Sequence, residues 1–486
     1  MPRQELNKTL GFIPLVALGV SGVIGSSWIY TNGTFFEKYG AGGMIFGLAI
    51  GTVLAACVAL SYAKLTALFP RAGGEVVYSY TILGRQMGFI VGWLLIGAYI
   101  SSLAFYFTAF GVLLELVFPQ LSTLPLYSIA GANVTLPVLI CGLALALLFY
   151  FLNYFGISLG AQVQTVLFGI LIVIGLSLAV VGFSQGSIHN FWPAYYEDRG
   201  ALLSTLRFVV PGMTYMAGFG LVATLAEDAK LPSATIGRLV VLTVLLAGTF
   251  YCVVLAASAF ILPWKEVATM DQGSITAFRQ AGFPLLGWGA FIIAIVGLLT
   301  SFLGLFMASS RIVFALARVR LLPPNLAKLH PQHHTPRDAL LFVLILTIGL
   351  GWLGKGAVGW FLDTGGIYLG LVWLIVVISH LRAPRRYPHL KDRIPPRSVL
   401  LPLVGAIGAV LVIILALYPG TDLSLIWPME YIILGGWFLL GGLLYAFASP
   451  LPEDQALADL LGEHVDTLSS DPTSTVPGRE AQSQRR

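Results

Sequence analysis

Long apolar runs recur almost from end to end of this chain, and they limit its fold more than any other feature. A bilayer core is about 30 Å thick and needs roughly 20 apolar residues per spanning helix. Membrane barrels are instead built from strands of about ten residues with alternating hydropathy. We therefore expect an all-α polytopic membrane protein of about 12 transmembrane helices. The predicted spans are approximately 11–35, 42–68, 86–118, 134–155, 159–184, 202–226, 238–262, 285–318, 338–354, 357–381, 400–418 and 427–449.

Composition supports this fold class. The chain is 57% hydrophobic and 10% charged, whereas a soluble domain has roughly a quarter charged residues. With twelve spans, one side of the membrane receives 21 of the 27 lysines and arginines. Since basic loops stay in the cytoplasm, we expect an integral protein of the plasma or inner membrane with both termini cytoplasmic. The net charge of +5 then reflects topology and not nucleic-acid binding.

Glycine clusters interrupt the first and the sixth span. The first contains Gly19, Gly22 and Gly25, and the sixth contains the run from Pro211 to Gly220. An unwound helix at membrane depth survives where it lines a cavity or binds a ligand. The alternative is that these glycines only permit close helix packing. Because the two clusters lie five spans apart, they favour a binding site near the midplane, between two inverted repeats.

Such a site suits a zwitterion. Free N–H groups from Ser21 to Gly25, at the start of a half-helix, can accept a carboxylate. Free carbonyls near Val20 and from Met216 to Gly218 can accept an ammonium group. An amino acid would therefore be held by main chain, and the surrounding side chains would select among substrates.

The stretch after the second span carries a more specific signal. It reads Phe69-Pro70-Arg71-Ala72-Gly73-Gly74-Glu75, followed by Tyr78, Tyr80, Gly84, Gly88, Phe89, Gly92 and Trp93. Together with the glycine-rich first span and the Gly218-Phe219 pair, it resembles the amino acid–polyamine–organocation superfamily of permeases. The resemblance covers residues 10 to 450. It implies a five-plus-five inverted repeat with broken helices 1 and 6, plus two extra C-terminal helices, and alternating access around one site.

The charge pattern, the composition and the resemblance together divide the chain. A cytoplasmic segment would cover 1–10, the two repeats 11–185 and 200–382, and the extra helices 399–449. A disordered cytoplasmic tail would follow at 450–486, where the sequence becomes polar.

The resemblance places the substrate on both helix breaks, and helix 3 offers Ile96, Tyr99 and Ile100 to the side-chain pocket. The implied substrate-binding residues are Val20, Ser21, Gly22, Val23, Ile24, Gly25, Tyr215, Met216, Ala217, Gly218, Phe219, Ile96 and Ile100. The aromatic residues Trp288, Phe291 and Tyr368 are further wall candidates. Because this region lacks an acid, we expect a neutral side chain rather than a cationic one.

Two departures from the superfamily leave the coupling mechanism open. Gly220 stands where many members have an acid, and Leu171 stands where several have a lysine that replaces sodium. A cation site is conceivable at the hydroxyls of Thr300 and Ser301, since such oxygens suit hard cations. The driving partner is then a proton, sodium or a counter-transported amino acid.

Other ionisable groups are assigned structural roles. We expect Glu75, Glu227 and Asp228 to form ion pairs with the arginines around Arg318 at the inner face, and Asp363 to be interfacial. The cluster of His330, His333 and His334 has no cysteine or carboxylate at ligand spacing, so no metal site is predicted.

The sequence thus predicts a secondary active transporter, permease or exchanger, of amino acids, preferably neutral ones. The alternatives are a polyamine or cationic amino acid permease and a non-transporting amino-acid sensor. An enzyme is disfavoured because no catalytic constellation is recognisable, and no cofactor is expected.

Overall fold

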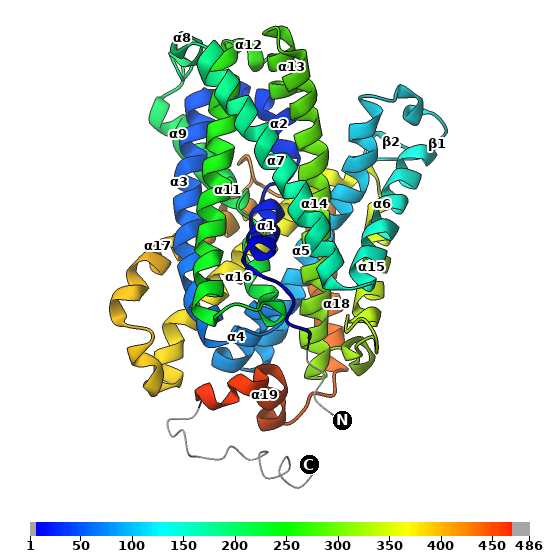
Figure 1. The fold of residues 1–486 in the computed structure, drawn as a ribbon, viewed down its shortest axis with the longest axis vertical. Coiled ribbons are helices and arrows are strands. Elements are labelled where there is room, and N and C mark those ends of the chain that lie inside the picture. Colours follow the sequence, from blue (N-terminus) through cyan, green and yellow to red (C-terminus); the bar gives the residue numbers. More distant parts are fainter. Residues whose placement is uncertain (1–5, 469–486) are drawn as a thin grey trace.

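The computed structural model describes residues 6–468 and is an elongated bundle of long helices (Figure 1). Within this range nine helices are long and apolar enough to cross a membrane. They are α3 (Asn32–Leu68), α5 (Arg85–Glu115), α6 (Leu136–Tyr154), α7 (Ile157–Gln185), α11 (Ser233–Ile261), α14 (Pro284–Arg318), α16 (Val358–Arg386), α17 (Leu400–Leu417) and α18 (Met429–Ala446).

Shorter helices complete the remaining spans. They are α1 (Phe12–Val23), α2 (Ser27–Tyr30), α9 (Ala201–Thr214), α10 (Leu221–Thr224) and α15 (Arg337–Gly351). The pairs α1 with α2 and α9 with α10 are each separated by non-helical residues, so both predicted helix breaks are present. The expectation of an all-α polytopic membrane protein is confirmed.

The first two spans meet at Gly40, inside α3. Gly40 has φ 73° and ψ 160°, which is not helical. A side chain there would also lie 2.9 Å from the carbonyl oxygen of Ala194. Glycine therefore both permits the corner and lets the neighbouring chain approach. Helix α3 therefore contains the end of the first predicted span and the whole second span, with a corner at Gly40.

The surface of the bundle is apolar where lipid is expected. Along α7, Val166, Val173 and Val180 are spaced seven residues apart and are 64%, 65% and 65% exposed. A soluble protein rarely exposes such a continuous apolar stripe. The bundle is therefore that of an integral membrane protein, with α7 at its periphery.

Small elements close the two ends of the bundle. We call the end with Lys8 and Glu463, whose side chains form an ion pair of 2.9 Å, the terminal face, and the opposite end the distal face. The distal face has η1 (Pro119–Ser122), the antiparallel hairpin β1 (Pro125–Ile129) and β2 (Ala132–Thr135), α8 (Ile188–Phe191), α12 (Trp264–Val267), α13 (Gly273–Gln280) and η4 (Lys355–Ala357). The terminal face has α4 (Gly74–Leu83), η2 (Ala226–Asp228), η3 (Pro324–Ala327), η5 (Pro388–Asp392), η6 (Pro396–Val399), α19 (Glu453–Leu461) and η7 (Gly462–Leu468).

The segment after residue 450 differs from its expected disorder. Instead, α19 and η7 pack on the terminal face, with Ala456, Leu460 and Leu461 buried. The carbonyl of Leu460 also accepts a hydrogen bond from Arg71 Nε at 3.0 Å. A few apolar residues in helical spacing are enough to dock this polar segment. Residues 469–486 of the predicted tail lie outside the described residues.

Main-chain hydrogen bonds join the start of the first broken span to the end of the sixth span. The N–H groups of Thr9 and Leu10 donate to the carbonyl of Asp228 at 2.8 and 2.9 Å, and the N–H of Lys230 donates to the carbonyl of Leu10 at 2.8 Å. The entry to α1 is thereby paired with the exit from α10. Helix α1 itself lies inside the bundle (Figure 1), where it packs against α7, α11 and α14.

Candidate functional site

A cavity of about 330 Å³ lies where the two breaks face each other. It extends toward the distal face, where Lys38 and Asp422 line it. Its deeper wall is made of both breaks and of α5, α11, α14 and α16. The residues lining this central cavity include Gly22, Val23, Gly25, Ser27, Trp28, Tyr99, Ser102, Phe105, Tyr106, Thr214, Tyr215, Ala217, Gly218, Tyr251, Leu305, Leu362 and Asp363.

The break in the first span lies later than expected. Helix α1 continues through Val23, and the N–H of Ile24 still donates to the carbonyl of Val20 at 3.0 Å. The prediction that the N–H groups from Ser21 onward are free is therefore wrong, because the glycines are accommodated within the helix. The carbonyl end of α1 faces the cavity instead, and a helix C-terminus carries partial negative charge.

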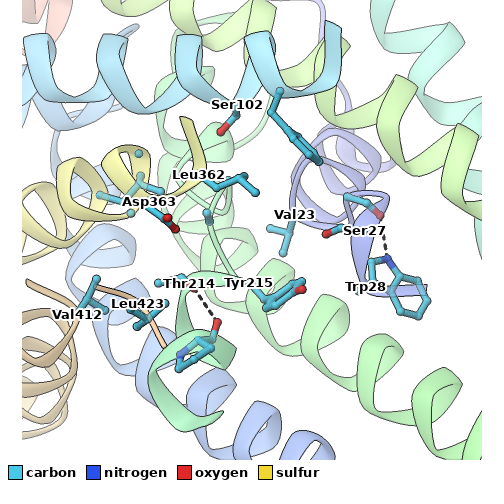
Figure 2. Close-up of a pocket in the computed structure, with 18 of the residues that line it drawn as sticks. Val23, Ser27, Trp28, Ser102, Thr214, Tyr215, Leu362, Asp363, Val412 and Leu423 are labelled. Carbon is cyan, nitrogen blue, oxygen red and sulfur yellow. Dashed lines mark hydrogen bonds between the residues drawn. The ribbon is translucent and has the colours of Figure 1, made fainter. Parts of the chain in front are cut away.

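Tyr251 of α11 spans this break. Its hydroxyl donates to the carbonyl of Val23 at 2.7 Å and accepts the N–H of Gly25 at 3.2 Å. The indole of Trp28 donates to the carbonyl of Gly25 at 2.8 Å (Figure 2). Side chains thus satisfy backbone groups that the interrupted helix leaves without helical partners.

The break in the sixth span is a series of tight turns. The N–H of Met216 bonds the carbonyl of Met213 at 3.1 Å, and that of Ala217 bonds Thr214 at 2.9 Å. Gly218 follows with φ +104°, and a side chain there would lie 2.6 Å from the carbonyl oxygen of Gly22. The two breaks are therefore in direct backbone contact at a pair of glycines.

The hydroxyls proposed for a cation face the carbonyls of the first span. Thr300 Oγ1 donates to the carbonyl of Ser21 at 3.2 Å, and Ser301 Oγ lies 3.3 Å from the same oxygen. Gln164 of α7 reaches this point, since its Nε2 donates to Ser21 Oγ at 2.7 Å and to the Thr300 carbonyl at 3.0 Å. A flipped amide would bring its oxygen against the Thr300 carbonyl, so the amide hydrogens point into this cluster.

The structure gathers some predicted site residues at the cavity and buries others. Six of them line it: Gly22, Val23, Gly25, Tyr215, Ala217 and Gly218. The others are buried outside its lining: Val20, Ser21, Ile24, Met216, Phe219, Ile96 and Ile100. Phe219, for example, packs against Tyr62 and Trp373 at 5.0 and 5.7 Å between ring centroids. Among the further wall candidates, Trp288 is 44% exposed and Tyr368 is buried away from the cavity.

Tyr99, which the sequence offered beside Ile96 and Ile100, lines the cavity, whereas Ser102 and Tyr106 were not predicted. On α5 the lining face is Tyr99, Ser102 and Tyr106, which are spaced three and four residues apart. That helical spacing of polar groups in an apolar span is a usable signal. Figure 2 shows Ser102 and Asp363 across the cavity from Val23 and Tyr215. Asp363, expected at the interface, thus places an acid in the same cavity.

On the terminal side a charged cluster closes the bundle under the breaks. Glu227 pairs with Arg318 at 3.0 Å and with Arg71 at 3.4 Å, and Asp228 pairs with Arg311 at 3.5 Å. We call these five residues the inner cluster. Its acids are at most 2% exposed. The predicted pairing of Glu227 and Asp228 with arginines is confirmed.

The surroundings shift the pKa values of both acids. Burial alone raises the pKa of Glu227, but Arg318 and Arg71 outweigh it and lower the pKa to about 2. Burial raises the pKa of Asp228 to about 6, although Arg311 opposes the shift. The ion pair expected for Glu75 is absent among the described residues, since its carboxylate instead bonds Thr224 Oγ1 at 3.0 Å. Within residues 6–468 no three His, Cys, Asp or Glu side chains are grouped so that they could hold a metal ion.

Comparison with known proteins shows which family and which transporters this chain resembles. Residues 10–439 match the family model described as amino acid permease. A branched-chain amino acid permease of Bacillus subtilis is 26% identical over 454 residues, covering 91% of this chain and 93% of the relative. The corresponding permease of Lactococcus lactis is 25% identical over 452 residues, with coverage of 91% and 94%. A methylthioribose transporter of Bacillus subtilis is 26% identical over 420 residues, with coverage of 84% and 87%.

Proposed function

The chain belongs to the amino acid permease family, and from this premise we propose that it transports amino acids with apolar side chains by alternating access. The observation that carries the proposal is the central cavity, where the backbone of two broken helices meets apolar and aromatic walls. Amino acid transport follows from the family, and the choice of side chain and the mechanism are the proposal.

Main-chain groups would hold the amino acid's charges. The carbonyl end of α1 is partially negative and suits the α-ammonium group. The α-carboxylate would face the N–H groups that open the next helical segment at Ser27, which lines the cavity. This revises the sequence-based assignment by moving the carboxylate to the later side of the break.

The cavity walls would select the side chain. Val23, Phe105 and Leu305 are apolar, and Tyr99 and Tyr215 add aromatic faces. Burying apolar surface contributes about 25 cal/mol per Å², so a branched-chain substrate gains affinity from these walls. Two relatives of this chain are named as branched-chain amino acid permeases, which supports the same choice.

The closed end of the molecule fits one step of the transport cycle. The cavity extends to the distal face, while the inner cluster lies buried on the terminal side. We infer an outward-facing conformation, with the distal face outside and both termini in the cytoplasm. We also propose that the protein does no covalent chemistry and that neither cofactor nor metal takes part.

Asp363 favours one alternative substrate class. Its carboxylate lines the cavity, where a cationic amino acid or polyamine could pair with it. A sensor that binds without transport is the other alternative.

Counterflow in proteoliposomes tests the function. Proteoliposomes that contain the purified protein and are loaded with unlabelled leucine should accumulate labelled leucine. Excess isoleucine or valine outside should compete. If lysine, arginine or putrescine competed better, the substrate would be cationic. Binding of leucine without any counterflow would identify a sensor and contradict transport.

A further inference from the structure

One buried acid takes no part in the inner cluster. Glu75 lies in the first turn of α4 and is fully buried. A Cβ atom built on Gly73, which has φ +82°, would lie 2.5 Å from Ala315 Cβ. One built on Gly74 would lie 2.9 Å from the Ala223 backbone. Because these two residues have no side chain, the start of α4 packs directly against α10 and α14. The carboxyl group of Glu75 is thereby inserted under the break in the sixth span.

Gly220 leaves the room that this carboxyl group occupies. A side chain built on Gly220 would collide with Glu75 Oε1, and its Cβ would lie 3.4 Å from the Tyr99 hydroxyl. Tyr99 also lines the central cavity. Tyr99 therefore borders both the cavity and the space beside the buried acid.

Within residues 6–468, Glu75 forms no ion pair with a lysine, arginine or histidine. Among residues 6–468 its Oε2 bonds the Thr224 hydroxyl at 3.0 Å, and the neutral phenol of Tyr62 also acts on the carboxyl group. On α14, Arg311 and Arg318 pair with Asp228 and Glu227.

Phenol groups surround Glu75 instead. The ionisable groups that act on it are Tyr62 of α3, Tyr78 of α4 and Tyr99 of α5. Elsewhere around α4, the His380 ring of α16 bonds Ser61 at 2.9 Å, Arg85 of α5 donates to the Leu451 carbonyl at 3.0 Å, and Glu453 of α19 pairs with Arg386 at 3.7 Å. A buried carboxyl group with neutral surroundings favours its protonated form.

The Thr224 hydroxyl connects the protonation of Glu75 to the helix break. It lies 3.0 Å from Glu75 Oε2 and 3.1 Å from the carbonyl oxygen of Gly220. A hydroxyl has one hydrogen to donate. When Glu75 is protonated, its O–H can donate to Thr224, which donates to Gly220. When Glu75 is ionised, Thr224 donates to the carboxylate and the Gly220 carbonyl loses this donor.

We propose that Glu75 is the proton-binding group that couples amino acid transport to a proton, an inference that rests on the proposed function. The proton enters from the distal side through the cavity, binds the Glu75 carboxylate and leaves from the same carboxyl group on the terminal side. One proton is gained and one is lost per cycle, and no other bond changes. Burial raises the pKa of Glu75 to about 7, so the group can load and unload near neutral pH.

Proteoliposomes with a trapped pH-sensitive dye test this coupling. Adding leucine outside should acidify the lumen for the wild type. Glu75→Gln should lose at least about tenfold of this proton flux and of uptake driven by a pH gradient, while leucine counterflow continues. Glu75→Asp, which keeps a titrating group, should retain part of the proton flux. Glu115→Gln is the matched control, because Glu115 is half-buried at the far end of α5 and should leave the flux unchanged.

The outcomes separate the two proposals. Wild-type counterflow without proton flux, or full proton flux in Glu75→Gln, would overturn the role of Glu75 and leave amino acid transport intact. Absence of wild-type counterflow would instead overturn the proposed function. Infrared titration of the purified protein is independent of transport: a carboxyl C=O band should disappear as the pH rises through about 7 and be missing in Glu75→Gln. A band that ignores pH or persists in the variant would refute the assignment.

Discussion

The Tyr251 hydroxyl donates a hydrogen bond to the carbonyl of Val23 at 2.7 Å, across the gap between α11 and the broken first span. The same oxygen accepts the N–H of Gly25. One phenol group therefore fixes both sides of the break. The geometry of the substrate site therefore depends on a tyrosine that lies more than 200 positions from the break in the sequence. Unlike the glycines of the break, a tyrosine gives no local sequence signal of this role.

Removing this hydroxyl should weaken substrate binding. In Tyr251→Phe two backbone groups lose their partner, at about 0.5–1.5 kcal/mol each. We expect leucine to bind roughly tenfold more weakly, measured by equilibrium binding to purified protein. Tyr127→Phe is the control, because Tyr127 lies on the distal hairpin and its hydroxyl bonds the Trp352 carbonyl there, far from the break. Unchanged affinity in Tyr251→Phe would show that the break holds its shape without this residue.

Gly218→Ala should abolish transport. The left-handed backbone at φ +104° costs about 1–2 kcal/mol for a residue with a side chain, and the methyl group would meet the Gly22 carbonyl at 2.6 Å. The two breaks would have to separate. Leucine counterflow should fall at least about tenfold while the protein still inserts and purifies. Gly349→Ala on α15 is the control, because an added methyl group there would have no atom within 4 Å. Its counterflow should equal that of the wild type. Normal transport by Gly218→Ala would contradict the tight contact between the breaks.

Uptake should not depend on sodium. The amide of Gln164 already donates to Ser21 Oγ and to the carbonyl of Thr300, so hydrogen-bond donors are present where a cation would be needed. Replacing sodium by choline at constant pH should leave leucine uptake unchanged. A loss of uptake in choline that returns with sodium would contradict this expectation and show that sodium drives transport.

Breaking the inner cluster should destabilise the closed terminal side. Arg318→Ala leaves Glu227 without its nearest cation, and losing one partner of a buried pair costs roughly 3 kcal/mol. Arg337→Ala removes an exposed pair with Asp338 and should cost below about 1 kcal/mol. Denaturant unfolding of the purified variants measures both values. Equal effects would show that the inner cluster adds no stability.

The stability of the same cluster should fall in acid. The pKa of Glu227 is lowered from 4.5 to about 2 in the folded protein. Its contribution is therefore complete above pH 4.5 and is lost as the pH falls toward 2. Thermal unfolding across this range should show a decrease in the wild type that is smaller in Glu227→Gln. A melting temperature that stays level down to pH 2 would rule out this contribution.

Asp363 should distinguish the substrate classes. Since a neutral amino acid needs no carboxylate beyond the backbone charges, Asp363→Asn should change leucine affinity by less than about twofold. Competition by lysine, if present in the wild type, should disappear in the variant. A large loss of leucine affinity would mean that Asp363 binds the α-ammonium group, and the assignment to the α1 carbonyls would then be incorrect.

The sequence predicted the all-α membrane fold and that the first and sixth spans are broken, because apolar length and glycine clusters are local signals. It predicted only part of the cavity lining. The break in the first span is shifted past Val23 because Gly19 and Gly22 fit inside a helix that packs closely on its neighbours. Ile96 and Ile100 were placed in the pocket by their helix, but their face of α5 points elsewhere, while Tyr99 and Ser102 face the cavity.

The sequence did not predict which residues far apart in the chain contact each other around Glu75. Glu75 was expected to pair with an arginine, as Glu227 does, since both were assigned to the inner face together with the arginines around Arg318. What separates them is the direction in which α4 carries the side chain, and this depends on the contacts of Gly73 and Gly74 with distant helices. No spacing within the motif encodes that direction.

The main-chain pairing of Thr9 and Leu10 with Asp228 and Lys230 has a consequence for how this chain can diverge. Backbone hydrogen bonds do not depend on side-chain identity, so substitutions other than proline can accumulate at these positions without uncoupling the two half-helices. Insertion or deletion of a single residue there would shift the register and separate them. Selection at this joint is therefore expected to act on segment length, and drift in sequence identity would leave it intact.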